Sequence, residues 1–399
     1  MTNSQIWTKN FLIDSMANFL IYLVYYLLMI IIASYAMDNL QASLSEAGLA
    51  VGIFIVGALL ARIFGGKSIE QVGRKKMLYI GLTVYLITTV LYFTLTNLPL
   101  LFLVRLLHGV GFGIASIATG TIIANIIPQE RRGEGISYYA MSTTLASAIG
   151  PFLGIYLNQH VSFHTIVVTC VALVAVSYIA AFFLKVPEAK LTIEQLENMN
   201  RFTLSNFIEF KALPISVIGA ILGFCYSSII GFLASYTKEI HLIEAGSFFF
   251  IVYSVAILIS RPLTGRWFDS KGENFVMYPS FVAFAIGLVL LSMAQQGLFL
   301  LLAGMLIGLG FGTFLSSGQT IAIKSSPDRM GLATSTFFAI ADVGVGIGPF
   351  FLGFLVSLFG FRGLYMSMAS VVFLTMCLYY LLCGRMAKSE EKLVQDIGI

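Results

Sequence analysis

Long apolar runs separated by short polar stretches dominate the pattern of this chain. A helix needs about 20 apolar residues to cross a hydrocarbon core of about 30 Å. Cutting the chain on that length gives twelve spans near residues 11–36, 46–64, 76–96, 99–122, 136–158, 164–184, 212–236, 246–262, 275–294, 298–320, 331–356 and 362–383. The strands of a membrane β-barrel would alternate apolar with polar residues, which these runs do not do. The pattern predicts an all-α polytopic membrane protein with twelve transmembrane helices.

Composition supports the same fold class. Of 399 residues, 58% are hydrophobic and only 11% are charged, whereas a soluble domain carries roughly 25% charged residues. Most of the surface must therefore face lipid, which excludes a soluble enzyme, a nucleic-acid binder and a disulfide scaffold. The four cysteines lie inside apolar runs and are expected to be small buried hydrophobes. The run from Phe11 to Met37 is too long for a cleavable signal and is expected to be the first span.

The basic residues orient the chain. Of the 23 Lys and Arg, 20 lie at the termini, in even-numbered loops or at the helix ends beside them. Only Lys238 and Arg362 fall in odd-numbered loops, and Arg105 lies inside a span. Because basic loops stay inside, both termini are expected in the cytoplasm. We expect a multi-pass protein of a bacterial cell membrane.

The chain divides into two similar halves. A polar stretch at 185–211 is expected to be a cytoplasmic central loop between a six-helix bundle at 1–184 and another at 212–399 with a short tail. Residues match at a nearly constant offset of 198 or 199, and the pairs are Arg62 with Arg261, Gly66 with Gly265, Gly73 with Gly272, Gly109 with Gly308, Gly113 with Gly312, Pro128 with Pro327, and Gly150-Pro151 with Gly348-Pro349. Parallel repeats of this kind are typical of transporters that rock two bundles about a midplane site.

Three short motifs carry a family resemblance. Residues 66–76 read GKSIEQVGRKK, and 265–272 repeat the pattern as GRWFDSKG. Residues 105–111 read RLLHGVG, and residues 146–154 read ASAIGPFLG. These segments resemble the loop signature, the fourth-helix element and the glycine-rich antiporter motif of the major facilitator superfamily, and the resemblance covers the whole chain. It implies two pseudo-symmetric bundles and a place near the twelve-helix drug/proton antiporters. Glu70 stands where the family has Asp, and Glu273-Asn274 stand where basic residues are usual.

The loop signature is expected to form a gating latch. A carboxylate beside cations at the helix ends can join neighbouring helices in one conformation and release them in another; plain topological anchoring is the alternative. The expected gating residues are Gly66, Glu70, Gly73, Arg74, Lys75, Gly265, Asp269 and Gly272, with Arg131 and Arg329 as latch partners. Glycine allows close helix contact and proline frees a carbonyl, so the expected helix-bending residues are Gly150, Pro151, Gly154, Gly348 and Pro349.

Ionisable residues inside the spans are candidates for coupling to an ion gradient. Asp342 lies 11 residues past Gly331, about 16 Å into the membrane, where a charge costs at least ~2.5 to 3.5 kcal/mol. It is a candidate proton carrier or cation-binding group. The resemblance implies a coupling role for Arg105, and His108, one turn later, is either a titrating partner or a packed histidine. Asp14, one turn into the first helix, is expected to be interfacial.

The family architecture implies that helices 1, 4, 7 and 10 line a substrate cavity. Its polar and aromatic candidates are Asn18, Tyr22, Tyr25, Tyr26, Tyr226, Ser316 and Gln319. We expect a proton-coupled exporter of small lipophilic or amphipathic compounds, with lipid, substrate and protons as its partners, acting as a monomer without cofactor, metal or nucleic acid. Alternatives are an exporter of a polar metabolite or metallophore, an importer of sugar or organic acid, and a membrane sensor. The four histidines show no metal or nucleophile spacing, which argues against an enzyme.

Overall fold

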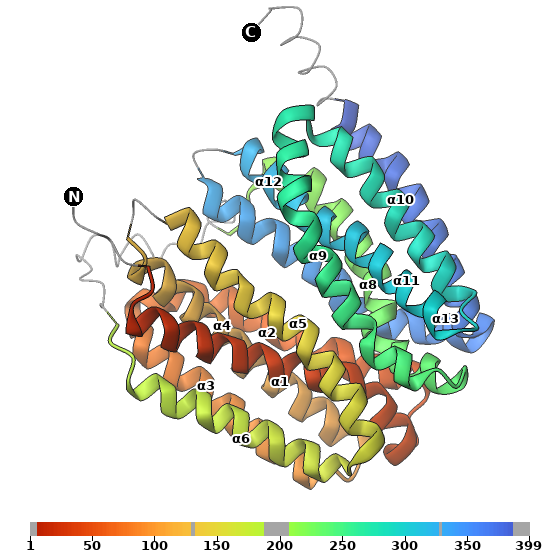
Figure 1. The fold of residues 1–399 in the computed structure, drawn as a ribbon. Helices are drawn as coiled ribbons and strands as arrows, with labels where there is room; N and C mark the ends of the chain where they lie inside the picture. Colours follow the sequence, from red (N-terminus) through yellow and green to blue (C-terminus); the bar gives the residue numbers. More distant parts are fainter. Residues whose placement is uncertain (1–5, 129–131, 187–206, 327–328, 386–399) are drawn as a thin grey trace, which may run out of the picture. The chain divides into compact units, whose positions relative to one another are not determined.

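The regular structure of this protein is helical throughout the part of the chain that is described. The computed structural model describes residues 6–128, 132–186, 207–326 and 329–385 (Figure 1). Within these ranges, eleven helical segments are long and apolar enough to cross a membrane. The last of them, Leu332–Gly384, contains two spans, because α13 (Met330–Tyr379) is broken at Gly360, where φ is 67° and ψ is 176°. The predicted all-α fold with twelve membrane spans is confirmed.

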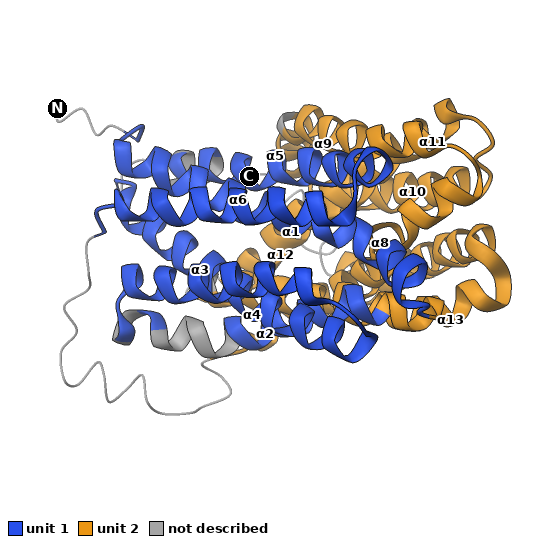
Figure 2. Cartoon of the chain, turned by 90° about the horizontal axis from the view of Figure 1, so that it is seen from below, with its two compact units in different colours: residues 1–42, 49–202 blue, residues 43–48, 203–399 orange. Residues whose placement is uncertain are grey.

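The chain forms two compact units, coloured separately in Figure 2. Unit 1 comprises residues 1–42 and 49–202, and unit 2 comprises residues 43–48 and 203–399. The helices of unit 1 in its described part are α1 (Lys9–Leu40), α2 (Leu44–Val72, which enters the unit at residue 49), α3 (Arg74–Leu91), η1 (Tyr92–Thr94), α4 (Leu98–Ile126), α5 (Arg132–His160) and α6 (Phe163–Phe182). Helix α1 packs against α4, α5 and α6, and α3 packs against α4 and α6.

Unit 2 repeats this arrangement with one irregular span. Its described elements are η4 (Phe210–Ala212), α8 (Leu213–Glu239), α9 (Ile243–Lys271), α10 (Glu273–Ser292), α11 (Gly297–Ile307), η5 (Gly308–Gly312), α12 (Thr313–Ser325), α13 and η7 (Tyr380–Gly384). Helix α13 packs on α8 and α10, and α11 packs on α9 and α10. The segments α11, η5 and α12 form one span with a π-helical turn at η5. Residues 43–48 belong to this unit, and the Ser45 hydroxyl donates to the carbonyl of Phe350 in α13 at 3.1 Å.

Matched glycines let the helices of each unit approach to backbone contact. A Cβ atom on Gly109 of α4 would overlap the carbonyl oxygen of Phe54 in α2. A Cβ atom on Gly308 of η5 would overlap the carbonyl oxygen of Tyr253 in α9. The next pair repeats this: a Cβ on Gly111 would lie 2.6 Å from the nitrogen of Tyr85, and one on Gly310 would lie 2.5 Å from that of Phe284. The +199 repeat is therefore a repeat of packing contacts as well as of sequence.

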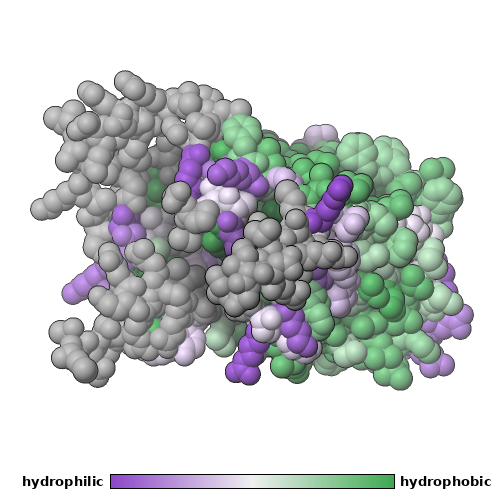
Figure 3. Space-filling view, turned by 90° about the horizontal axis from the view of Figure 1, so that it is seen from above, coloured by the Kyte–Doolittle hydropathy of each residue, from purple (hydrophilic) through white to green (hydrophobic). Residues whose placement is uncertain are grey.

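The outer surface is apolar. Large side chains such as Leu358, Leu381 and Ile259 are 72%, 68% and 67% exposed. In Figure 3, hydrophobic residues form a broad continuous area on the right, and hydrophilic side chains gather near the middle and at the right-hand edge of that area. A contiguous apolar surface of this extent is stable only against another apolar phase. The fold therefore presents to lipid the side chains that a soluble protein would bury.

Candidate functional site

Arg105 is the largest fully buried side chain of the described residues. Its Nε donates to the carbonyl of Ala50 at 2.8 Å, and its terminal nitrogens donate to the hydroxyl of Tyr92 at 3.3 Å and the carbonyl of Val51 at 3.4 Å. The guanidinium also lies 4.5 Å from the centre of the Phe54 ring, within range of a cation–π contact. Among the described ion pairs none joins Arg105 to a carboxylate. Carbonyl dipoles and an aromatic face therefore stabilise this cation.

His108 is packed in the same interior. Its Nε2 lies 3.1 Å from the Thr89 hydroxyl, and its Nδ1 lies 3.3 Å from the Tyr92 hydroxyl. The imidazole is stacked on Tyr85, with ring centres 4.3 Å apart and planes 6° apart. Both ring nitrogens thus have hydroxyl partners, and the rings of Phe54 and Tyr92 pack edge-on against the imidazole. This geometry favours the packed-histidine alternative over a titrating group.

Asp14 is buried, which its position one turn into α1 did not indicate. Its side chain is 0% exposed, and neither carboxyl oxygen has a hydrogen-bond partner among the described residues. The Tyr139 hydroxyl of α5 is buried beside Thr119 and within electrostatic range of this carboxyl. A buried carboxylate without hydrogen bonds is costly, whereas a neutral carboxylic acid costs much less. The position therefore suits a group that exchanges a proton.

Asn18, predicted to line the cavity, joins three helices in unit 1. Its amide nitrogen donates to the hydroxyls of Ser142 at 2.8 Å and Thr143 at 3.1 Å. Its carbonyl oxygen accepts from the Thr119 hydroxyl at 3.1 Å. The side chain is 1% exposed. Asn18 therefore holds α1 to α4 and α5, one turn from Asp14.

The tyrosines of α1 form an aromatic cluster with α2 and α4. Tyr25 is stacked on Phe54, with ring centres 5.1 Å apart, and on Phe112 at 4.8 Å. Tyr22 meets the Phe112 ring edge-on at 5.0 Å, and Tyr26 lies 4.6 Å from Tyr25. All three tyrosines are half-buried. Unit 1 thus gathers the three predicted aromatic residues into one cluster.

In unit 2 the predicted cavity residues lie on two helices, α8 and α12. Tyr226 of α8 is stacked on Phe311, with ring centres 4.2 Å apart, and on Tyr253 at 5.8 Å. The Ser316 hydroxyl donates to the carbonyl of Thr313 at 3.0 Å within its own span, and Gln319 is half-buried in α12. The acid of this unit, Asp342, is half-buried in α13.

The loop signature has a backbone basis in both units. Gly73 directly precedes α3 with φ 97°, and Gly272 separates α9 from α10 with φ 82°. A residue with a Cβ atom rarely adopts such angles. Gly66 lies in α2 and Gly265 in α9. The turns at positions 73 and 272 therefore require glycine, because the backbone adopts positive φ angles there.

The residue two positions after each of these glycines holds the end of the unit's last helix. The Lys75 ammonium donates to the carbonyls of Leu184 at 2.7 Å and Phe182 at 3.4 Å, at the end of α6. The Asn274 amide donates to the carbonyl of Gly384 at 2.9 Å, at the end of η7. Carbonyls at a helix end lack partners within the helix. Asn274, which departs from the family pattern, thus makes the same kind of bond as Lys75. Arg74 is buried beside it.

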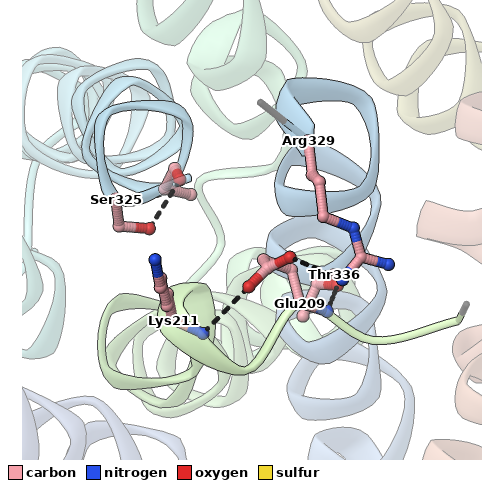
Figure 4. A network of polar contacts seen from close by, with 6 residues as sticks. Glu209, Lys211, Ser325, Arg329 and Thr336 are labelled. Carbon is pink, nitrogen blue, oxygen red and sulfur yellow. Dashed lines mark hydrogen bonds and ion pairs between the residues drawn. The ribbon is translucent and has the colours of Figure 1, made fainter. Parts of the chain in front are cut away.

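Arg329 forms an ion pair that the sequence did not suggest. Its guanidinium lies 3.2 Å from the Glu209 carboxylate, whose other oxygen accepts from the backbone N–H of Lys211 at 3.3 Å (Figure 4). The backbone N–H of Glu209 donates to the Thr336 hydroxyl at 2.9 Å. These bonds tie the segment before α8 to the start of α13. Arg131 and the side chains of Glu70 and Asp269 lie outside the described residues.

The Gly-Pro elements pack against the first long helix of each unit. A Cβ atom on Gly150 of α5 would lie 2.6 Å from the Cβ of Tyr26, and one on Gly154 would lie 2.6 Å from the carbonyl oxygen of Leu27. A Cβ atom on Gly348 of α13 would overlap the Ser227 hydroxyl of α8. Pro151 and Pro349 lie inside α5 and α13.

No cluster of three His, Cys, Asp or Glu suited to a metal occurs in the described ranges.

Comparison with known sequences gives a family and its members. The profile of the Major Facilitator Superfamily matches residues 15–274 and 215–396. The chain is 24% identical to a staphylopine export protein of Staphylococcus aureus, over 86% of this chain and 88% of that protein. It is 26% identical to multidrug resistance protein MdtL of Citrobacter koseri, over 89% of this chain and 90% of that protein.

Solved structures share the fold. The nucleoside transporter NupG superposes with a TM-score of 0.75 at 16% identity, covering 93% of this chain and 99% of that one. A bacterial homologue of the lysosomal transporter Spinster superposes with a TM-score of 0.77 at 14% identity, covering 93% and 96%. At these identities the likeness shows a shared fold and no more.

Proposed function

This chain belongs to the major facilitator superfamily, and on that premise we propose that it exports small lipophilic or amphipathic compounds in exchange for protons. It is a transporter and not an enzyme, because its family and its relatives are transporters. Export is supported by the names of the multidrug resistance and export proteins to which it is similar. The proposed orientation places both termini in the cytoplasm, and the proposed functional unit is the monomer.

The observation that carries the coupling proposal is the burial of Asp14 without a hydrogen-bond partner among the described residues. Such a carboxyl is held most cheaply in its neutral form and loses its proton when water or a cation reaches it. We therefore assign the proton to Asp14 first and to Asp342 second. The proposed part of Arg105 in coupling rests on the resemblance of its motif to the family's fourth-helix element, since its described contacts are with Ala50, Val51 and Tyr92 and not with Asp14. His108 is assigned a packing role.

The aromatic cluster of α1 supports the substrate class. Tyr22, Tyr25 and Tyr26 are half-buried, and ring faces and edges bind apolar and cationic surfaces without demanding one shape. Tyr226 and its stacked neighbours offer a similar surface in unit 2. The alternative is export of a polar metabolite or metallophore; the name of the Staphylococcus aureus relative says that that protein exports staphylopine. A panel containing both classes of compound separates the two.

The gating proposal rests on the loop signature. Gly73 and Gly272 fix the turns, and Glu70, Asp269, Arg131 and Arg329 are the proposed latch groups. The Glu209–Arg329 ion pair supports this proposal, because it holds one of the proposed latch arginines to a carboxylate at 3.2 Å. Exchange of such pairs between conformations is a common means of switching.

The test is transport into inverted membrane vesicles with an imposed pH gradient. Asp14→Asn should abolish gradient-driven accumulation and leave gradient-free exchange, because the amide keeps the size of the acid but cannot bind and release a proton. Asp342→Asn is the comparison variant, which removes the candidate acid of the other unit. Accumulation by Asp14→Asn at the wild-type level would remove this residue from the mechanism. Loss of gradient-driven accumulation in Asp342→Asn alone would indicate that the proton carrier is Asp342 in unit 2.

A further inference from the structure

Residues 6–8, directly before α1, are folded onto the end of unit 1. Ile6 is 2% exposed although it precedes the helix. It packs in a cluster with Phe11, Ile123 and Ile127, against which Tyr139 also packs. We call these residues the N-terminal cluster. It joins the beginning of α1 to the end of α4 and to α5.

Polar and aromatic contacts hold this segment in place. The Trp7 ring meets Phe11 edge-on with ring centres 5.3 Å apart and lies 4.9 Å from the ring of Tyr138. The Thr8 N–H donates to the carbonyl of Ile6 at 2.7 Å. The Thr8 hydroxyl accepts from the N–H of Phe11 at 3.2 Å and caps α1. Residues 6–8 are therefore docked by specific contacts within unit 1.

The docked segment lies directly before Asp14. Asp14 follows Phe11 by three residues on α1, so the two side chains share a face of the helix. Tyr139 connects them from α5, since its ring packs against the N-terminal cluster and its hydroxyl is in electrostatic range of Asp14. The N-terminal cluster thus packs on α1 one turn before this carboxyl.

We propose that residues Ile6–Thr8 are a lid that controls access of water to Asp14 from the side of the membrane on which the N-terminus lies. The lid rests on the proposed role of Asp14 as proton carrier. When it is docked, the carboxyl keeps its proton in an apolar enclosure. When it lifts, water accepts the proton from the carboxyl or a hydronium ion returns one to the carboxylate. An acid that carries protons across a membrane needs such an interruptible path, since a permanently open one would dissipate the gradient.

The lid is small enough to open. Its docking depends on one fully buried side chain, Ile6, and on a Trp7 ring that is 56% exposed. Local opening of a terminal segment of this kind lies at the low end of the stability range in a protein. Shortening these two side chains should therefore raise the open fraction without unfolding α1, which begins after the Thr8 cap.

The experiment measures access to Asp14 directly. Inverted vesicles holding the full chain are treated with a water-soluble carbodiimide and an amine, and modification of Asp14 is followed by mass spectrometry. Ile6→Ala combined with Trp7→Ala should speed modification about tenfold, because truncation of a buried side chain weakens its docking. Ile6→Val, which removes one methylene, should give a smaller rise of about twofold. Asp38, which is exposed, is the internal reference for reagent activity.

Leu12→Ala is the matched control, since Leu12 is 52% exposed on the same helix and outside the N-terminal cluster. Equal rates for the wild type and both Ile6 variants would overturn the lid, as would an equal rise in Leu12→Ala. If Asp14→Asn loses driven transport while no lid variant changes labelling, the lid proposal is refuted and the carrier role of Asp14 is kept. If labelling rises as expected while Asp14→Asn transports normally, the carrier role is refuted and residues 6–8 still control access to this carboxyl.

Discussion

Where α4 of unit 1 carries Arg105, the matching helix of unit 2 carries Gly304, and the offset of 199 residues between them also relates Gly109 to Gly308. The glycines make the same backbone contacts in both units. The polar positions have no such counterpart: His108 matches Ile307, and Asp14 matches Leu213. Close approach of two backbones leaves no choice of residue, whereas an interior side chain can change if its partners change. The two units therefore share their packing and differ in their chemistry.

This difference is the reason why we propose that the coupling chemistry lies mainly in unit 1. Its interior contains a buried cation, a buried acid and a hydrogen-bonded asparagine. In unit 2, the described ion pair lies at the helix ends, between Glu209 and Arg329, and the Arg329 side chain is 44% exposed. Variants at matched positions can test both the shared packing and the separate chemistry.

The largest effect is expected where the units are alike. Gly109→Ala and Gly308→Ala should each destabilise the fold by about 3 kcal/mol, because the added methyl group would overlap a backbone oxygen that cannot move aside. The measurement is the yield of folded protein in detergent and its thermal unfolding. Gly265→Ala is the control, since a Cβ there has no neighbour within 4 Å. Tolerance of only one of the two substitutions would break the claim of shared packing.

The next effect should separate the units. Arg105→Met should lower driven transport at least about tenfold, the equivalent of 1.4 kcal/mol, while leaving thermal stability unchanged or higher, because a buried cation without a carboxylate partner is replaced by an apolar chain. Gly304→Ala, at the matching position, should leave driven transport near the wild-type level and lower the melting temperature slightly, because its Cβ would lie 3.0 Å from the carbonyl oxygen of Phe249, which would have to shift. Transport assays and melting curves on the same preparations decide. Full transport by Arg105→Met would contradict a coupling role.

The smallest effect concerns the ion pair of unit 2. Glu209→Gln should cost about 0.5 to 1 kcal/mol of stability, since one partner is partly solvated and exposed pairs contribute little. The difference from wild type should shrink as salt is added, because ions screen the pair. Glu239→Gln, at an exposed position in the same unit, is the control. A cost that does not depend on salt would show that hydrogen bonding, and not charge, holds this corner.

Run length predicted the spans because bilayer thickness fixes the length of a crossing helix. The pattern also placed the last two spans at 331–356 and 362–383, and α13 breaks between them at Gly360. The pattern could not give the π-helical turn at Gly308–Gly312, because that depends on contacts with α9 and α10. Such contacts bring together residues that are distant in sequence.

The interior of unit 1 was predicted less completely than its spans. Depth along α1 suggested an interfacial Asp14, but depth does not tell which face of the helix a residue occupies. Asn18 was identified as polar within a span, yet its partners Ser142 and Thr143 lie 124 and 125 residues away. Glu209 and Arg329 are similarly remote in sequence. A polar or charged residue within an apolar span can be identified from the sequence, whereas the residue that it contacts is known only from the folded structure.

The bonds of Lys75 and Asn274 bear on how the loop signature is recognised in sequences. A search pattern that demands a basic residue two places after the second glycine accepts the first copy in this chain and rejects the second. The structure gives both residues the same task of donating to carbonyls at a helix end. A pattern written for a hydrogen-bond donor at that place would accept both copies. Diverged duplicates in other proteins would then be found by what the side chain can do and not by its charge.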